Sequence, residues 1–193
     1  MNQNNSQCRV YIDMTNLTLA GSHVAAVAKG LAPSLAVANT YNVFDFAWRL
    51  DVRALLSRVA WSGSRRATRL VACGSSSGYD AAYWRTVQQA GIEAVIEQRK
   101  PGHREKGVDV AFAMEVLHDA ESCLEPGDEI TLVAGDGDYV PLVRRVRERG
   151  LHVRVAFWSS AAKALKEAAS EFVCLDRDLP RLTLAPYARR RAA

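Results

Sequence analysis

Four aspartates stand where an apolar run ends or an expected helix begins: Asp13, Asp109, Asp136 and Asp138. Carboxylates gathered in one cleft repel one another, so they are stable at neutral pH when some are protonated or a divalent cation lies among them. Mg²⁺ and Mn²⁺ suit hard oxygen ligands and accept further ligands from a phosphate. Such a metal activates water and neutralises charge on a phosphate, which is the chemistry of phosphodiester hydrolysis.

Three of the four aspartates also have a structural explanation. Asp138 is an ordinary N-cap for the helix that follows it, and Asp109 suits the positive end of a helix dipole. Asp13 could close its strand with an Asx turn. The coincidence of several acids at strand ends, where α/β sheets bind ligands, favours a shared site.

Short apolar runs alternate with helical stretches along the chain. The runs expected as strands are 9–12, 70–73, 92–96, 130–134, 152–157 and 172–175; the expected helices are 44–60, 79–90, 108–122, 139–149 and 161–170. Several runs are apolar on both faces, which is typical of a parallel sheet covered by helices. We expect a doubly wound α/β fold, with residues 21–42 as an insertion carrying a short helix.

Composition indicates an ordinary domain. The 193 residues are 49% apolar and 24% charged, with a net charge of +4. No apolar run reaches the length of a membrane span, and the polar first seven residues lack the pattern of a secretory signal, so we expect a cytoplasmic protein. The expected boundaries are a disordered N-terminus at 1–7, a single domain at 8–178 and a basic tail at 179–193. The four scattered cysteines lack zinc-site spacing.

Three motifs resemble those of the NYN domain in the PIN-like nuclease superfamily, especially its bacterial LabA-like branch. Ile12-Asp-Met-Thr-Asn-Leu17 resembles I-D-x-x-N-L, and Lys106-Gly-Val-Asp-Val-Ala111 resembles K-G-V-D-V-x. Gly135-Asp-Gly-Asp-Tyr-Val-Pro-Leu142 resembles G-D-x-D-F-x-P-L and is the most specific of the three. The resemblance extends over residues 9–176.

This resemblance implies a Rossmann-like, PIN-like three-layer sandwich with a mainly parallel sheet, and an Mg²⁺- or Mn²⁺-dependent ribonuclease site. It assigns the catalytic and metal-binding positions to Asp13, Asp109, Asp136 and Asp138. It also implies that the amide of Asn16 helps to hold the loop after the first strand. The chain departs from the family pattern at Glu115 and Ser170, where many relatives carry Asp.

Basic and aromatic residues are candidates for binding RNA. His103, Arg104 and Lys106 lie in a basic loop that leads into the Asp109 motif, a position that suits phosphate binding. The alternative is an ordinary solvated loop. Asn16 is a further substrate-binding candidate, and Trp158 is the aromatic residue we would test for base stacking, although such aromatics are more often in the core.

The leading hypothesis is a metal-dependent endoribonuclease with RNA as its partner, without membrane association and with homodimerisation left open. The alternative is a catalytically weak or inactive NYN-type module that binds RNA or protein. A haloacid-dehalogenase-type phosphatase requires Asp-x-Asp at the first strand, whereas Met14 and Thr15 follow Asp13 here. The phosphatase hypothesis is therefore the least favoured.

Overall fold

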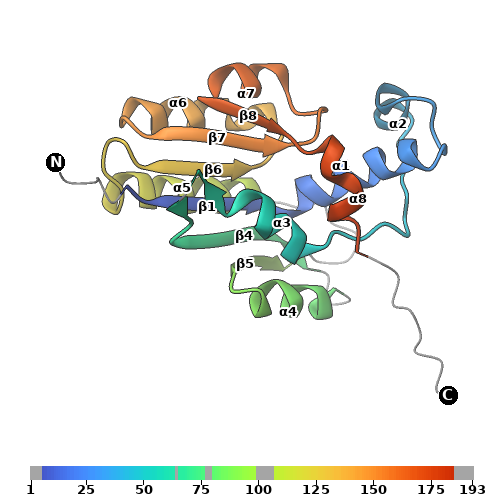
Figure 1. The fold of residues 1–193 in the computed structure, drawn as a ribbon, viewed down its shortest axis with the longest axis horizontal. Helices are drawn as coiled ribbons and strands as arrows, with labels where there is room; N and C mark the ends of the chain where they lie inside the picture. Colours follow the sequence, from blue (N-terminus) through green and yellow to red (C-terminus); the bar gives the residue numbers. More distant parts are fainter. Residues whose placement is uncertain (1–5, 64, 77–79, 99–106, 185–193) are drawn as a thin grey trace.

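A six-stranded parallel sheet forms the centre of the protein in a computed structural model that describes residues 6–63, 65–76, 80–98 and 107–184 (Figure 1). In spatial order the strands are β5 (Glu93–Gln98), β4 (Arg69–Ser76), β1 (Cys8–Asp13), β6 (Glu129–Val133), β7 (His152–Phe157) and β8 (Glu171–Cys174). All five pairings are parallel, so all carboxyl ends meet at one edge of the sheet. This edge lies on the right in Figure 1.

Helices cover both faces of the sheet. One face carries α1 (Met14–Ala28), α3 (Val52–Val59), α4 (Ala81–Gln89) and α8 (Leu179–Leu182); the other carries α5 (Val108–Ser122), α6 (Val140–Glu148) and α7 (Lys163–Ala168). The short elements are α2 (Leu35–Thr40), the antiparallel pair β2 (Trp61–Ser62) and β3 (Arg65–Arg66), and the 3₁₀ turns η1 (Gly137–Tyr139) and η2 (Asp176–Asp178). The expected three-layer α/β sandwich is confirmed.

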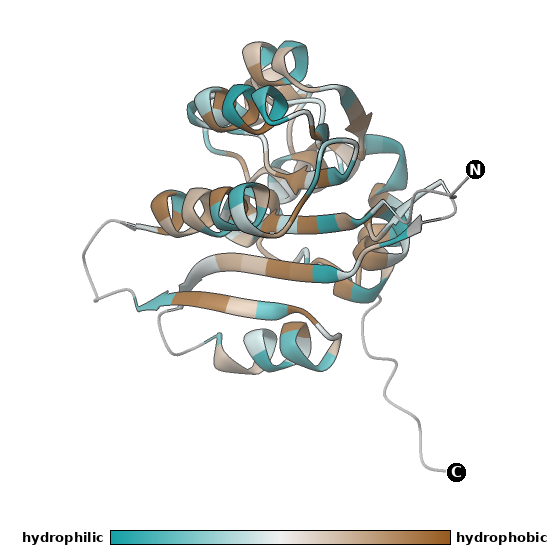
Figure 2. Ribbon diagram, turned by 90° about the vertical axis from the view of Figure 1, so that its left-hand side faces the viewer, coloured by the Kyte–Doolittle hydropathy of each residue, from teal (hydrophilic) through white to brown (hydrophobic). Residues whose placement is uncertain are grey.

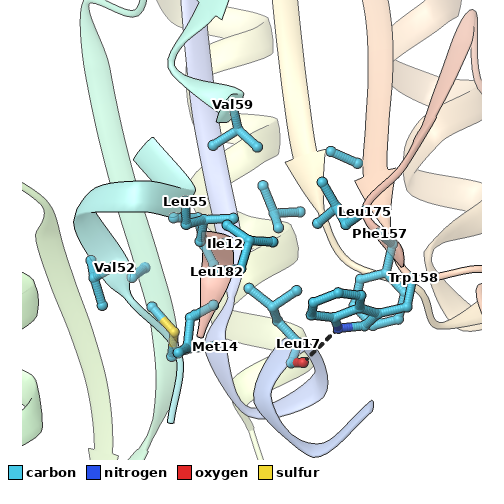
Figure 3. Close-up of a cluster of buried hydrophobic side chains, with 14 of the residues drawn as sticks. Ile12, Met14, Leu17, Val52, Leu55, Val59, Phe157, Trp158, Leu175 and Leu182 are labelled. Carbon is cyan, nitrogen blue, oxygen red and sulfur yellow. Dashed lines mark hydrogen bonds between the residues drawn. The ribbon is translucent and has the colours of Figure 1, made fainter. Parts of the chain in front are cut away.

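The apolar runs build two cores because alternate strand residues point to opposite faces. In β1, Val10 and Ile12 pack beneath α1 and α3, whereas Tyr11 packs beneath α5. Figure 2 shows the apolar residues on the strands and on the helix faces turned toward them, and Figure 3 shows part of the first core. Among the described residues, no helix is long and apolar enough to cross a membrane.

Two helices differ from the sequence expectation. Helix α1 begins directly after β1, and the helix expected from residue 44 begins only at Val52. In both helices an aspartate caps the first turn: the Asp13 side chain accepts from the Asn16 amide, and that of Asp51 accepts from the Ala54 amide. These caps set the helix starts more strongly than hydrophobic periodicity does.

The expected tail boundary at residue 179 is wrong, because Leu179 and Leu182 are buried in the core. Thr183 forms a β-bridge with Leu50, so the packed chain extends beyond α8. At the other end, the backbone amide of Gln7 donates to Asp128 at 2.6 Å. The remainder of the two expected terminal segments, 1–5 and 185–193, lies outside the described residues.

Candidate active site

The strand order places a ligand-binding crevice beside β1. The chain passes from β1 to β4 and β5 on one side, then crosses to β6 on the other. In open α/β sheets, ligands bind at the carboxyl edge where the strand order reverses in this way. Asp13 ends β1 and Asp136 follows β6, so both lie at this reversal point.

The side chain of Asp13 is held through both of its oxygens. Its Oδ1 accepts from the Asn16 amide at 3.0 Å and caps α1, while its Oδ2 accepts from the Tyr139 hydroxyl at 2.7 Å. The residue is 2% exposed. A buried carboxylate is costly unless hydrogen bonds compensate for lost water, and these donors contribute to that compensation.

Tyr139 joins the acids of two elements. Its hydroxyl also lies 3.1 Å from Oδ1 of Asp109, so one phenolic oxygen contacts both carboxyl groups. The hydroxyl has a single proton and can donate it to only one carboxylate at a time. Burial and the two acids raise the pKa of Tyr139 well above its usual value, so the proton stays on the phenol. In the sequence, Tyr139 stands only at the start of the expected helix 139–149, which gives no sign of these contacts.

The start of α5 presents Asp109 to solvent. Gly107, the N-cap residue, has φ of 95°, a left-handed conformation that glycine adopts without strain. The helix begins after it, with Asp109 in the first turn, where the helix dipole favours a negative charge. The expectation of a helix over residues 108–122 agrees with α5.

The turn after β6 holds Asp136 at the rim. Its Oδ1 accepts from the backbone amide of Asp138 at 3.0 Å, which fixes the carboxylate within the turn. The preceding residue, Gly135, donates its amide to Oδ1 of Asn16 at 2.9 Å and so ties this turn to α1. A side chain at Gly135 would collide with the Phe157 ring, since an added Cβ would lie 2.1 Å from it. Glycine therefore permits this close approach.

A pocket of about 180 Å³ collects these groups. It is lined by Asp13, Thr15, Asn16, Leu19, Gly107, Val108, Asp109 and Asp136. We call it the carboxylate pocket. Three of the four aspartates singled out in the sequence line it together with Asn16, whereas Asp138 does not. His103, Arg104 and Lys106 lie outside the described residues.

The expectation for Trp158 is wrong. Its side chain is completely buried, and its indole N–H donates to the carbonyl oxygen of Leu17 at 2.9 Å (Figure 3). It packs edge-on against Trp48. A nucleobase cannot stack on a ring without exposed surface, so Trp158 supports the core and the position of α1.

The donor set of the carboxylate pocket fits a hydrated Mg²⁺ or Mn²⁺. Asp109 and Asp136 are exposed carboxylates, and the pocket has room for water around an ion. Mg²⁺ commonly binds through one or two carboxylates and keeps several waters. Among the described residues, the pocket has no three His, Cys, Asp or Glu ligand atoms within 4.8 Å of one another.

Tighter ligand spacing occurs elsewhere, at His118, Asp119 and Cys123. Asp119 is 2% exposed and pairs with Arg9 at 2.6 Å and with Arg69 at 2.8 Å. Burial alone would raise the pKa of Asp119, but hydrogen bonds from Tyr11, Arg69 and Arg9 lower it below the usual value. Because two guanidinium groups already neutralise this carboxylate, the cluster is a poor cation site.

The sequence profile of the NYN domain matches residues 7–176. The chain belongs to the NYN domain family. This membership places it in the PIN-like nuclease superfamily, as the three sequence motifs had indicated. No match was found among curated proteins.

The fold of this NYN domain also occurs in a solved structure, a protein of unknown function, VPA0982, from Vibrio parahaemolyticus RIMD 2210633. The similarity has a TM-score of 0.66 and 17% sequence identity, and covers 95% of this chain and 99% of the other. At this identity the comparison supports the fold and carries no information on activity.

The two departures from the NYN pattern lie away from the carboxylate pocket. Glu115 pairs with Arg69 at 2.9 Å, at the amino end of β4. Ser170 accepts a hydrogen bond from the amide of Val153 and precedes β8, again at the amino edge. Neither substitution alters the set of acids that line the pocket.

Proposed function

We propose that this NYN domain is a divalent-metal-dependent ribonuclease that hydrolyses RNA phosphodiester bonds at the carboxylate pocket. One observation carries the proposal. The Tyr139 hydroxyl contacts both Asp13 and Asp109 at the rim that Asp136 also lines, so three carboxyl groups gather at one pocket. Such a concentration calls for a cation.

The chain's own groups have separate tasks in this proposal. Asp109 and Asp136 are exposed and hold the ion and its water at the pocket. Asp13 and Tyr139 are buried and fix the position of the start of α5 relative to β1. When bound, Mg²⁺ or Mn²⁺ supplies a water of lowered pKa and a positive charge next to the phosphate.

Cleavage within a strand is supported by the shape of the surface. The carboxylate pocket shares Thr15 with a neighbouring pocket on one side. It shares Asn16 and Leu19 with another pocket that extends along α1. A strand that follows these adjoining pockets would continue past the acids, which suits an endoribonuclease. His103, Arg104 and Lys106 remain proposed phosphate-binding residues, and Asn16 remains a proposed substrate contact.

The spacing of the acids favours a second candidate, an RNA-binding module without turnover. The described pocket acids do not form a three-ligand group within 4.8 Å. The two candidates differ in their need for metal. Titration calorimetry with Mn²⁺ distinguishes them, because the nuclease requires saturable metal binding that weakens in Asp109→Asn and Asp136→Asn, and the binding module does not.

The direct test is cleavage of a circular single-stranded oligoribonucleotide, which has no ends for an exonuclease. We expect linear product with Mg²⁺ or Mn²⁺, none with EDTA, and at least a 100-fold lower rate for Asp109→Asn or Asp136→Asn. Glu121→Gln is the matched control, because Glu121 lies at the opposite end of α5 and pairs with Arg145.

Equal, metal-independent cleavage by the wild type and both Asp variants would reject the mechanism. Absence of cleavage by a protein that still binds RNA would favour the binding module. A wild-type cleavage rate in Glu121→Gln would show that the rate depends on the pocket acids and not on the loss of any one negative charge.

A further inference from the structure

A second pocket adjoins the carboxylate pocket along α1. It measures about 220 Å³ and is lined by Asn16, Leu19, Ala20, His23, Asn39, Gly135, Phe157 and Ser160. Asn16 and Leu19 line both pockets, so the two spaces meet at these side chains. A ligand bound in the carboxylate pocket can therefore extend into this second space. We call it the α1–α2 pocket.

Aromatic rings extend outward from the α1–α2 pocket. His23 lies 4.2 Å from Phe44 between ring centroids, and Phe44 lies 5.6 Å from Phe46. His23 is nearly buried, whereas Phe46 is 80% exposed. The series thus leads from the pocket wall to an aromatic face in solvent. A large apolar ring that is this exposed contributes little to the core and is available to a planar ligand.

The segment that carries these rings is held firmly against α1. The carbonyl oxygen of Val43 accepts from Nδ1 of His23 at 2.9 Å, and the amide of Asp45 donates to the carbonyl oxygen of Ser22 at 3.0 Å. Asp45 is buried and pairs with Lys29 at 2.5 Å. This pair lowers the pKa of Asp45, so its carboxylate stays ionised and the segment stays fixed. Phe46 is exposed on a positioned backbone.

The pocket also contains polar groups suited to the edge of a base. The Oγ atom of Ser160 is buried and has no hydrogen-bond partner among the described residues. Asn39 is exposed on α2, and its amide offers both a donor and acceptors. Unpaired RNA bases are recognised by stacking on aromatic rings and by hydrogen bonds to their edges.

We infer that the α1–α2 pocket binds one unpaired nucleobase of the RNA strand whose phosphate lies at the carboxylate pocket, with Phe46 as its outer stacking surface. This inference rests on the proposed function for the choice of RNA as ligand. A base in a duplex has its pairing edge occupied and its faces stacked, so the pocket selects strands with an unpaired nucleotide next to the scissile phosphate.

The test is fluorescence anisotropy with a labelled single-stranded oligoribonucleotide, with Ca²⁺ in place of Mg²⁺ and strand integrity checked on a gel. We expect about tenfold weaker binding by Phe46→Ala, since base stacking on an aromatic ring is of this size. Phe46→Tyr retains a ring and is expected within twofold of the wild type. Trp61→Ala is the matched control, because Trp61 is exposed on β2, away from the pocket.

Asn39→Ala provides a second variant without loss of an aromatic ring, with an expected affinity several-fold below that of the wild type. A strand with one abasic position beside the scissile bond isolates the base itself. We expect the wild type and Phe46→Ala to bind that strand equally. Thermal denaturation checks that each variant remains folded, which the exposure of Phe46 and Asn39 leads us to expect.

The inference is overturned if the wild type does not bind the strand, or if Phe46→Ala and Asn39→Ala both bind within twofold of it. Hydrolysis of the strand with Mg²⁺ or Mn²⁺ is measured separately from binding. A strand that is bound in this Phe46-dependent way but never cut with Mg²⁺ or Mn²⁺ contradicts the nuclease proposal alone. A strand that is cut at the wild-type rate and bound equally by the wild type, Phe46→Ala and Asn39→Ala contradicts the base site alone.

Discussion

At the scale of single residues, the proton of Tyr139 is the feature that organises the acids. The phenol lies in a buried position against two carboxyl groups, and all three effects oppose its ionisation. The folded protein therefore retains this proton at a pH where the unfolded chain loses it. Alkaline conditions then favour unfolding, because the unfolded state binds one proton fewer.

The Tyr139→Phe variant tests this linkage. We expect a loss of about 1 kcal/mol at neutral pH from the missing hydrogen bond, with the buried ring retained. Between about pH 10 and 12, the unfolding free energy of the wild type should fall more steeply than that of the variant by about 1.4 kcal/mol per pH unit, the value for one proton. Urea unfolding at several pH values measures both slopes.

Tyr41→Phe, which alters an exposed ring, serves as control and is expected to keep the wild-type slope. Equal slopes for the wild type and Tyr139→Phe would mean that Tyr139 loses its proton at the same pH in the folded and unfolded states.

Residue types at strand ends were predictable, whereas side-chain directions were not. Asp13 and Asp136 could be placed because the carboxyl ends of parallel strands share an edge. Tyr139 fits an apolar helix face equally well, and its hydroxyl contacts depend on how η1 packs against α5. Trp158 follows a strand end, but its burial results from the packing of α1 across it.

At the scale of elements, ionic contacts fix α5 to the sheet. Asp119, in the last turns of α5, accepts hydrogen bonds from Tyr11 on β1 and Arg69 on β4 and pairs with Arg9 on β1. Arg69 also pairs with Glu115 and Glu93. The opposite end of the same helix supplies Asp109 to the pocket, so these contacts set the orientation in which Asp109 is presented.

Asp119→Asn should destabilise the fold by about 2 to 3 kcal/mol at pH 7, because two guanidinium groups lose their buried counter-charge. The pKa of Asp119 is lowered in the folded state, so its contribution is complete above about pH 4 and is lost on further acidification. The difference between variant and wild type should therefore shrink toward pH 2. Chemical denaturation at the two pH values measures it, with Glu121→Gln as the control; a constant difference would contradict the argument.

Gly135→Ala tests the close approach between the turn after β6 and β7. The new methyl group would overlap the Phe157 ring, so we expect a loss of about 2 kcal/mol or more from overpacking. Gly137→Ala is the matched control: its Cβ would lie 3.3 Å from that of Ala162, a much milder contact. Thermal denaturation ranks the two variants, and equal melting temperatures would contradict this account.

Element types were more predictable than element starts. The six strands and α5 follow from apolar runs and helical periodicity. Helix α1 was not expected, because it begins without a loop after β1 and its Ala-, Ser- and Gly-containing sequence has weak periodicity. The Asp13 cap creates this abrupt start, and a residue that also faces the pocket gives little sign in sequence that it caps a helix.

At the scale of the whole molecule, the two edges of the sheet differ in their charge. The amino edge contains paired charges, such as Arg154 with Glu129 and Arg9 with Asp119. The carboxyl edge presents Asp109 and Asp136 to solvent. The net charge of +4 therefore does not describe the surface that a phosphate backbone would meet.

The C-terminal segment belongs to the folded unit through α8. Leu182 is 1% exposed, and Leu182→Ala should cost about 2 to 4 kcal/mol through the loss of buried area and the cavity left behind. Denaturant titration of Leu182→Ala against the wild type measures this loss, and an unchanged unfolding free energy would contradict the role of α8 in the core.

Asp13, at the end of β1, stabilises two parts of the fold. One carboxylate oxygen caps α1, and the other accepts a hydrogen bond from the Tyr139 hydroxyl. If the proposed catalysis were lost in a descendant, selection for folding alone would therefore still retain Asp13. Asp109 and Asp136 are exposed at the rim and contribute less to the packed core. Among related sequences, we expect Asp109 and Asp136 to be replaced before Asp13. The presence of Asp13 alone is therefore no sign of activity.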